Sequence, residues 1–416
     1  MRVLLGAFGD PGHAFPMIAL GRALRARGHD VTLQTWRRWQ PDVEREGLVF
    51  APAPEYQVFP SGSEPLDFYE AVVHATRETV PLVREVAPDV IVADILTLAP
   101  ALAAELEGRK CATLIPHVYP HHERDFPVYS LGGRMPRRAI GRAAWRGLQR
   151  PVQKGLRRGR AELNATRAQL GLPPHQHVHG GISSELALVA TFPQLEYPRR
   201  WPAHTHVVGP LMWEPSSSAV EPPPGDEPLV LVAPSTAQDP EHHMLQAALE
   251  GLAHAPVRVL ATWNRRLPPR ALPVPDNAKA VEWVRYSSVM PQCDVVVCHA
   301  GHGTLVRALA SGAAVVACPA VGDMNENAAR VDWAGAGVRV PRRFVSPRVL
   351  RLAVMRAIEN PSIRERAREM ARWARDHDSG AVAAGFIEEL GGAGGGDTGA
   401  ARGRSGPQPV ALESSD

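Results

Sequence analysis

Short apolar runs alternate with longer segments of helical period along most of the chain, and this rhythm constrains the fold more than any other feature. In the first half the runs are Val3–Phe8, Val31–Gln34, Val90–Ala93, Ala112–Ile115 and Leu186–Ala190. In the second half they are Leu229–Ala233, Val257–Ala261, Val295–Cys298 and Ala314–Cys318. Strands that alternate with helices pair in parallel and are covered on both faces, so the sequence predicts an α/β protein with two doubly wound sheets.

A polar, proline-rich stretch separates the two sets of runs. Residues 214–228 read EPSSSAVEPPPGDEP, which offers almost nothing to bury. We therefore expect an N-terminal domain over 1–213, a linker over 214–228 and a C-terminal domain over 229–390, because 416 residues suffice for two cores. Residues 391–416 are glycine-rich and lack periodicity, and we expect them to be disordered.

The composition excludes several classes of protein. The net charge is only +3, so a general attraction to nucleic acid is not expected. No apolar run approaches the ~20 residues of a membrane-spanning helix. Met1 leads directly into a strand-like run rather than a secretory signal, which favours the cytoplasm. The cysteines lack paired spacing and indicate neither disulfides nor a zinc site; they are Cys111, Cys293, Cys298 and Cys318.

A glycine-containing loop follows the first apolar run. It reads GDPGHAFP and places Gly9, Gly12 and His13 at the carboxyl end of a strand, the edge where open α/β sheets bind ligands. The loop lacks the GxGxxG spacing of a dinucleotide site, so a hydride-transfer enzyme is not expected. A neutral imidazole here suits proton abstraction from a hydroxyl near pH 7, which makes His13 a candidate general base. The alternative is a helix cap or a surface histidine.

An aspartate ends the run VIVAD. If its strand lies near the first strand, the Asp94 carboxylate faces the same crevice as His13. It can then orient the imidazole and stabilise its protonated form. The alternative is that Asp94 caps a helix beginning near Leu96.

The stretch HAGHGT follows a buried run and indicates an anion site. Gly301 and Gly303 let a bound group approach the backbone, and the helix expected to begin near Thr304 directs its unpaired amides outward. Such a loop suits a diphosphate, with His299 and the Thr304 hydroxyl as additional donors. Unlike a Walker loop it has no lysine, and it needs no metal-holding pair.

Two further loops add polar residues at strand ends of the second sheet. Asp323 and Asn327 follow its last apolar run, just before an expected helix. Ser235 and Thr236 follow its first run and are positioned to close over the phosphate from the other side. Polar groups are therefore expected to converge on one crevice.

Together these motifs resemble the inverting, metal-independent glycosyltransferases of the GT-B fold that decorate natural products, a family similar to the UDP-glucosyl- and UDP-glucuronosyltransferases. The stretch from Trp283 to Val340 resembles the donor-binding signature of that family: a tryptophan, a histidine–glycine loop, a proline, a sugar-binding acid and an asparagine. GDPGHAFP resembles the family's GHxxP start, and VVGPLMW its segment before the linker. The resemblance implies two Rossmann-like domains that face each other across a cleft.

The resemblance also implies a role for each candidate residue. His13 would deprotonate the acceptor, with Asp94 as its partner. The donor side would comprise Trp283 and Val284 at the base, Ser235, Thr236, His299, Gly301, Gly303 and Thr304 at the diphosphate, and Asp323 and Asn327 towards the sugar. A nucleoside diphosphate sugar would be the co-substrate, and no metal or other cofactor is expected. Displacement in one step would invert the anomeric carbon.

Two positions depart from the family's pattern. Met324 stands where a glutamine commonly reads a sugar hydroxyl, and an apolar thioether suits a donor that lacks a hydroxyl, such as a deoxysugar. Arg285 and Tyr286 replace the usual proline and glutamine after the tryptophan. Uridine and thymidine donors therefore both stay open.

Other interpretations share the same fold. A nucleotide-sugar epimerase would need carboxylates around the sugar, and a non-catalytic helper that binds nucleotide sugars would tend to lose the base. We expect a small hydrophobic or aromatic acceptor, because the loops Tyr56–Glu70 and His117–Tyr129 are rich in aromatic and histidine residues. The basic stretch Arg134–Arg167 fits either an anion- or membrane-binding surface or two solvated helices. The oligomeric state, monomer or homodimer, stays open.

Overall fold

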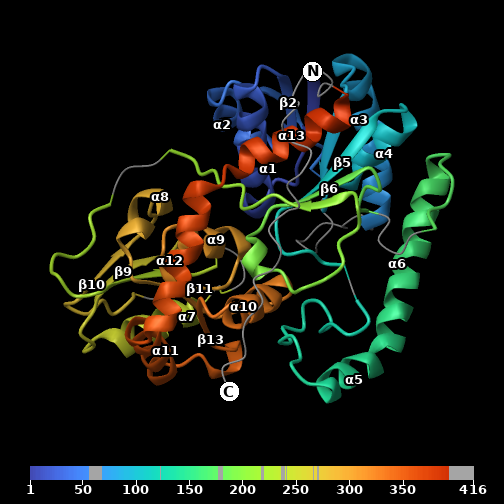
Figure 1. Ribbon diagram of the computed structural model, residues 1–416. Helices are drawn as coiled ribbons and strands as arrows, with labels where there is room; N and C mark the ends of the chain where they lie inside the picture. Colours follow the sequence, from blue (N-terminus) through green and yellow to red (C-terminus); the bar gives the residue numbers. More distant parts are fainter. Residues whose placement is uncertain are drawn as a thin grey trace.

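Two parallel sheets, one in each half of the chain, form the framework of the molecule (Figure 1). The computed structural model describes residues 1–55, 68–121, 123–176, 181–216, 220–235, 239, 241–265, 267–268 and 271–392. The first sheet contains β1 (Arg2–Gly6), β2 (Asp30–Thr35), β3 (Val49–Pro52), β4 (Val90–Asp94), β5 (Lys110–Ile115), β6 (Leu186–Val189) and β7 (Thr205–Val207). The second contains β8 (Leu229–Ala233), β9 (Arg258–Thr262), β10 (Ala278–Val281), β11 (Val295–Cys298), β12 (Ala314–Ala317) and β13 (Gly337–Arg339).

Helices cover both faces of the sheets. The first half contains α1 (Pro11–Ala26), α2 (Gln40–Arg45), α3 (Phe68–Val86), α4 (Leu98–Leu106), α5 (Ala139–Gly147) and α6 (Gln149–Gln169). The second half contains α7 (His243–Leu252), α8 (Tyr286–Val289), α9 (His302–Ala310), α10 (Asp323–Trp333), α11 (Pro347–Glu359), α12 (Pro361–Asp376) and α13 (Ser379–Gly391). Alternate residues of β1 pack on opposite faces: Val3 and Leu5 contact the side of α1, and Leu4 the side of α3 and α4.

Both sheets reverse their strand order beside their first strand. The orders are β3-β2-β1-β4-β5-β6-β7 and β10-β9-β8-β11-β12-β13, with every pair parallel. At such a switch point the connections leave in opposite directions and open a crevice at the carboxyl ends of the strands. The predicted α/β class with two doubly wound sheets is confirmed, and each half of the chain has one switch point.

Four strands were not predicted from apolar runs, and all four lie at the sheet edges. β3, β7, β10 and β13 are three or four residues long. An edge strand has one neighbour and keeps part of its surface in water, so its sequence need not be continuously apolar. AKAV in β10 and GVR in β13 carry no run that sequence patterning detects.

The last helix of the chain returns to the first domain. Ala383, Ala384 and Ile387 of α13 join the core beneath β1 and α1, and Figure 1 shows this helix lying over the N-terminal half. The two sheets span residues 2–207 and 229–339, on either side of the stretch 214–228, and the predicted domain bounds themselves stay a prediction. Gly391 ends α13, and residues from 393 onward lie outside the described part of the chain.

The two domains also share apolar packing. Val118, Phe192 and Leu195 from the first half are buried in one cluster with residues of β8, β11 and α9 from the second. The two halves of the chain are therefore joined by a continuous core.

The basic stretch Arg134–Arg167 forms most of α5 and α6, which lie at one side of the molecule in Figure 1. α5 buries none of its residues, and nothing in the structure assigns this stretch a ligand. None of the helices in the described ranges combines the length and apolarity needed to cross a bilayer.

Candidate active site

The N-terminal switch point holds the His13–Asp94 pair that the sequence predicted. β1 and β4 are neighbours, and Nδ1 of His13 lies 2.8 Å from Oδ1 of Asp94. The Asp94 side chain is fully buried, whereas the imidazole keeps 16% of its surface exposed. An ionised carboxylate can only accept a hydrogen bond, so Nδ1 carries the proton and Nε2 is the nitrogen that can accept one.

Opposing effects act on the pKa of His13. Burial, the largest single effect, lowers it, but the charge and hydrogen bond of Asp94 together with nearby carboxylates outweigh burial, and the pKa of His13 is raised above its ordinary 6.5. The charges of Asp10 and Asp323 act in the same upward direction. Asp94 thus stabilises the imidazolium that His13 becomes after taking a proton.

One detail differs from the expectation, and the alternatives considered for both residues do not apply. His13 lies within the first turn of α1 rather than in the loop before it, and it is neither a helix cap nor a surface residue. Asp94 does not cap the following helix, which begins at Leu98. Its carboxylate instead accepts hydrogen bonds from His13 and, at 3.4 Å, from the amide of Phe8.

Residues after β2 hold the loop that leads to His13. The indole of Trp39 donates to the Gly9 carbonyl at 2.7 Å, and Arg38 donates to the same oxygen. A Cβ at Gly9 would lie 2.0 Å from the Trp36 ring, so a side chain there would push the loop off its support.

The C-terminal switch point holds the HAGHGT loop between β11 and α9. The helix begins at His302 rather than near Thr304, so Gly303 and Thr304 lie in its first turn, where the backbone amides have no intrahelical partner. Ala300 adopts a left-handed backbone conformation with φ 62, an unusual conformation for a residue with a side chain. The loop thus directs a helix N-terminus towards the crevice, which suits an anion.

The two glycines of this loop serve different purposes. A Cβ at Gly301 would lie 2.3 Å from Nε2 of His299, so the absence of a side chain lets the imidazole pack against the loop. A Cβ at Gly303 would meet nothing within 4 Å. Space beside Gly303 is therefore open for a ligand to approach the backbone.

The same loop carries two histidines, the half-buried His299 and the buried His302. Burial lowers the pKa of His299 and lowers that of His302 to about 3, so both rings are neutral near pH 7. Nε2 of His302 lies 3.4 Å from the Ala190 carbonyl of the first half, which helps to join the domains. Sequence reasoning assigned His299 but missed His302, although the HAGHGT spacing shows both.

Asp323 and Asn327 occupy different parts of α10. Asp323 is its first residue and is half-buried at the cleft end. Asn327 is buried, and its amide donates to the Ala300 carbonyl at 3.0 Å. Asn327 therefore supports the loop from behind, and any contact of it with a donor stays a prediction.

The remaining residues predicted to bind the donor also include both partly exposed and buried side chains. Trp283 is half-buried, and the Arg265 guanidinium lies 4.6 Å from its ring centroid on one face. Val284 is buried in the core, so only its backbone is positioned to meet a base. Ser235 is buried directly after β8, and Thr236 lies outside the described residues.

Comparisons with known proteins identify relatives of this chain. Residues 246–390 match the family model described as "Erythromycin biosynthesis protein CIII-like, C-terminal domain". The 4'-demethylrebeccamycin synthase of Lentzea aerocolonigenes is 27% identical, over 94% of this chain and 99% of its own. The O-mycaminosyltylonolide 6-deoxyallosyltransferase of Streptomyces fradiae is 27% identical, over 89% of this chain and 93% of its own. These relatives along nearly the whole chain are antibiotic glycosyltransferases, and the chain is similar to them.

Solved structures agree on the fold of this chain. The glycotransferase of kitacinnamycin aligns with a TM-score of 0.74 at 23% identity, covering 93% of this chain and 98% of that one. Glycosyltransferase VinC, solved in complex with dTDP, aligns with a TM-score of 0.69 at 20% identity, covering 95% and 100%. The predicted GT-B fold is confirmed.

A second histidine lies beside the His13–Asp94 pair. The His117 and His13 rings have centroids 6.5 Å apart and are nearly perpendicular. Nδ1 of His117 donates to the Val118 carbonyl at 2.8 Å and lies 3.3 Å from the Tyr129 hydroxyl. Burial lowers the pKa of His117, so the ring is neutral and Nε2 carries the lone pair. Sequence reasoning placed His117 in an acceptor loop, but only the fold brings it to His13.

Two further observations concern possible ligands. Within the described ranges, no group of three or more His, Cys, Asp or Glu side chains is arranged to hold a metal ion. Most of the other predicted acceptor loop, Tyr56–Glu70, lies outside those ranges.

Proposed function

We propose that the protein transfers a deoxysugar from a thymidine diphosphate donor to a hydroxyl group of a small apolar or aromatic acceptor, with inversion at the anomeric carbon. The observation that carries this proposal is the His13–Asp94 contact of 2.8 Å at the N-terminal switch point. Tyr129, beside His117, and Met324, beside Asp323, pack against one shared core cluster, which supports a single site between the two domains.

In this mechanism His13 is the general base. Its Nε2 takes the proton of the acceptor hydroxyl while the oxygen attacks the anomeric carbon, and Asp94 stabilises the resulting imidazolium. The buried carboxylate cannot leave the pair without losing its hydrogen bonds, so it also fixes the ring orientation. General-base assistance of this kind contributes about 10²–10⁴-fold.

The leaving diphosphate would bind at the N-terminus of α9. Backbone amides of its first turn, the Thr304 hydroxyl and the neutral His299 supply donors to the developing negative charge. This arrangement needs no metal ion, and we propose a metal-independent reaction. A single displacement by an oxygen that enters opposite the diphosphate inverts the anomeric carbon.

The identity of the donor rests on two supports. Met324 offers a half-buried thioether at the start of α10, beside Asp323. A sugar hydroxyl buried against this thioether without a hydrogen bond would weaken donor binding by about 1–3 kcal/mol. The name of one relative specifies a 6-deoxyallosyl group, and the VinC structure contains dTDP. A UDP-sugar is the alternative outcome of the test.

The same proposal includes a flat hydroxylated acceptor and a cytoplasmic location. Near His13, Nε2 of His117 can accept a hydrogen bond, and the Tyr129 ring offers an aromatic surface. Both features suit a flat hydroxylated molecule as the sugar acceptor. All four cysteines are free thiols, which favours the reducing cytoplasm. The His13–Asp94 pair favours a transferase over a non-catalytic helper, and an epimerase would need carboxylates around the sugar rather than one histidine base.

The test is a screen of TDP- and UDP-sugars by thermal shift, followed by mass spectrometry with aromatic and polyketide-like acceptors. We expect TDP to stabilise the protein and a glycoside of inverted configuration to form, as read from the anomeric coupling in its NMR spectrum. A failure of all nucleotides to bind would overturn the donor site. Product without acceptor, in the form of an isomerised donor, would establish the epimerase instead.

A further inference from the structure

A buried ionic network joins the two domains next to the cleft. We propose that the Glu196–Arg330 ion pair is a positioning device that aligns the acceptor side of the cleft with the donor side. This inference rests on the function proposed above, because it assigns the two sides by His13 and Asp323.

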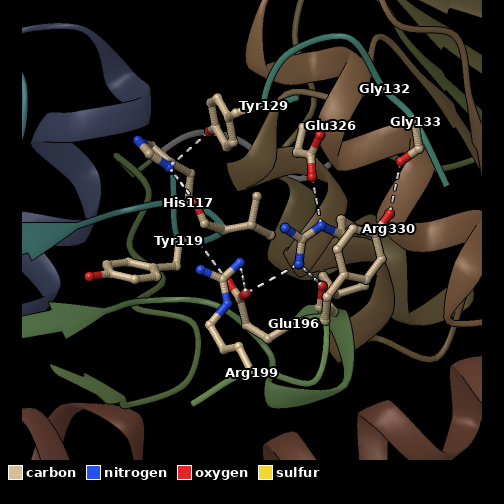
Figure 2. Close-up of polar contacts among 12 residues, drawn as sticks. His117, Tyr119, Tyr129, Gly132, Gly133, Glu196, Arg199, Glu326 and Arg330 are labelled. Atoms are coloured by element: carbon tan, nitrogen blue, oxygen red, sulfur yellow. Dashed lines mark hydrogen bonds and ion pairs between the residues drawn. The ribbon is translucent and has the colours of Figure 1, made fainter. Parts of the chain in front are cut away.

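Arg330 lies inside α10 and is almost completely buried. Its side chain is 2% exposed, and Nε donates to Oε1 of Glu326 at 2.8 Å on the same helix. Nη1 reaches the first domain, where it donates to the Leu195 carbonyl at 3.0 Å and to Oε2 of Glu196 at 3.1 Å. The guanidinium also lies 3.6 Å from the centroid of the Tyr197 ring. Figure 2 shows Arg330 between the two carboxylates.

Glu196 connects this arginine to the acceptor side. Its second oxygen, Oε1, accepts a hydrogen bond from the backbone amide of Tyr119 at 2.6 Å. Tyr119 follows β5 in the segment that carries His117, whose ring neighbours His13. One buried carboxylate therefore holds the backbone next to the proposed base.

Arg330 connects the same carboxylate to the donor side. α10 begins at Asp323, and a helix rises 1.5 Å per residue, so Arg330 lies about two turns along a rigid element from the proposed sugar-binding carboxylate. Arg339, in β13 after α10, donates to the Gly132 carbonyl, and Arg134 forms an ion pair with Asp332 of α10. The segment beyond His117 is thus tied to the donor domain at several points.

Electrostatics favour a geometric role over a stabilising one. Burying an ion pair costs desolvation that its attraction barely repays, and apolar side chains of similar volume often stabilise a core equally well. The network also leaves Oε2 of Glu326 buried without a hydrogen bond. The planar guanidinium of Arg330 fixes the direction of each hydrogen bond that it donates. It can therefore fix the position of α10 relative to the segment after β5.

The experiment compares Glu196→Gln and Glu196→Asp with wild type, and uses Arg372→Gln as the control. Arg372 lies on α12 of the same domain and pairs with Glu365 at the surface, so its loss removes an ion pair without touching the cleft. For Glu196→Gln we expect kcat to fall about 10–100-fold, since a misplacement of ~1 Å costs about 10²-fold. The Kd for TDP should stay within twofold, because the nucleotide contacts lie wholly in the second domain. The fraction of donor hydrolysed rather than transferred should rise.

Glu196→Asp keeps the charge but shortens the reach, and we expect an intermediate kcat with unchanged TDP affinity. This variant carries the test if Glu196→Gln does not fold. Retention of wild-type kcat and hydrolysis fraction in folded Glu196 variants would overturn the inference. A parallel loss of TDP binding and kcat would also overturn it, because the pair would then only hold the fold. Failure of the wild type to bind any nucleotide would instead refute the proposed function.

Discussion

The two switch points have the same topology but opposite electrostatics. At the N-terminal one, a partly exposed histidine is paired with a buried carboxylate, and the pKa of His13 is raised. At the C-terminal one, the half-buried His299 and the buried His302 have no hydrogen bond to a carboxylate among the described residues, and burial lowers the pKa of both. In the proposed mechanism, the same residue type therefore serves proton transfer in one crevice and neutral hydrogen bonding in the other. A switch point fixes where a ligand binds, and the partner of each histidine decides its chemistry.

The largest change in transfer rate is expected when the proposed base at the N-terminal switch point is removed. For His13→Ala we expect kcat for transfer to fall about 10²–10⁴-fold, because no other group replaces the proton acceptor. The Kd for TDP, measured by calorimetry, should change less than twofold. Loss of TDP binding in this variant would contradict the account, because it would mean that the N-terminal crevice, and not only the C-terminal one, binds the donor.

The next effect comes from the partner of the base. Asp94→Asn keeps the shape of the pair but removes the charge that stabilises the imidazolium, and we expect transfer to slow by about 10²-fold. Steady-state kinetics with the acceptor found in the screen measure this. Asp89→Asn provides the control, because its carboxylate only accepts from the Arg2 amide on the exposed far end of the sheet. Equal rates for wild type and Asp94→Asn would remove Asp94 from the mechanism.

A smaller effect, on the Kd for TDP, is expected at the C-terminal switch point. His299→Ala removes one neutral donor from the anion site, and we expect the Kd for TDP to rise about tenfold, the value of one hydrogen bond to a charged group. The pH dependence of transfer should keep its wild-type position, because His13 is unchanged. A shift of that dependence would mean that the two crevices are not separable.

The smallest effect concerns the sugar. Met324→Gln restores a polar side chain beside Asp323, and we expect the ratio of kcat/KM for TDP-glucose over a TDP-deoxysugar to rise about threefold to tenfold. Competition between the two donors, followed by mass spectrometry, measures the ratio directly. An unchanged ratio would show that Met324 has no part in reading the sugar.

Sequence patterning predicted the central strands and the loops at their ends because buried parallel strands must be apolar and their carboxyl ends carry the ligand residues. It missed the edge strands, which keep one side in water, and it placed the start of α9 at Thr304 rather than His302. The neutral state of His302 depends on burial by residues far away in the chain, so no local pattern reveals it.

Long-range polar contacts were even less accessible from the sequence. Glu196 and Arg330 are separated by 134 positions, and each occurs in a segment that reads as ordinary polar surface. Only the packing of η2 (Pro193–Leu195) against α10 makes them buried partners. The candidate base could be predicted because it follows a strand end, whereas the groups that align the two crevices could not.

The pH dependence of kcat/KM between pH 5 and 9, in wild type and Asp94→Asn, tests the central assignment most directly. A base must be neutral, so wild-type activity should rise with pH through a limb whose apparent pKa lies above 6.5, the direction in which Asp94 raises the pKa of His13. Removal of the carboxylate charge leaves burial as the main effect on the pKa of His13, and the limb should move to lower pH in Asp94→Asn. A flat wild-type profile, or a limb in the same place in both proteins, would contradict His13 as the base.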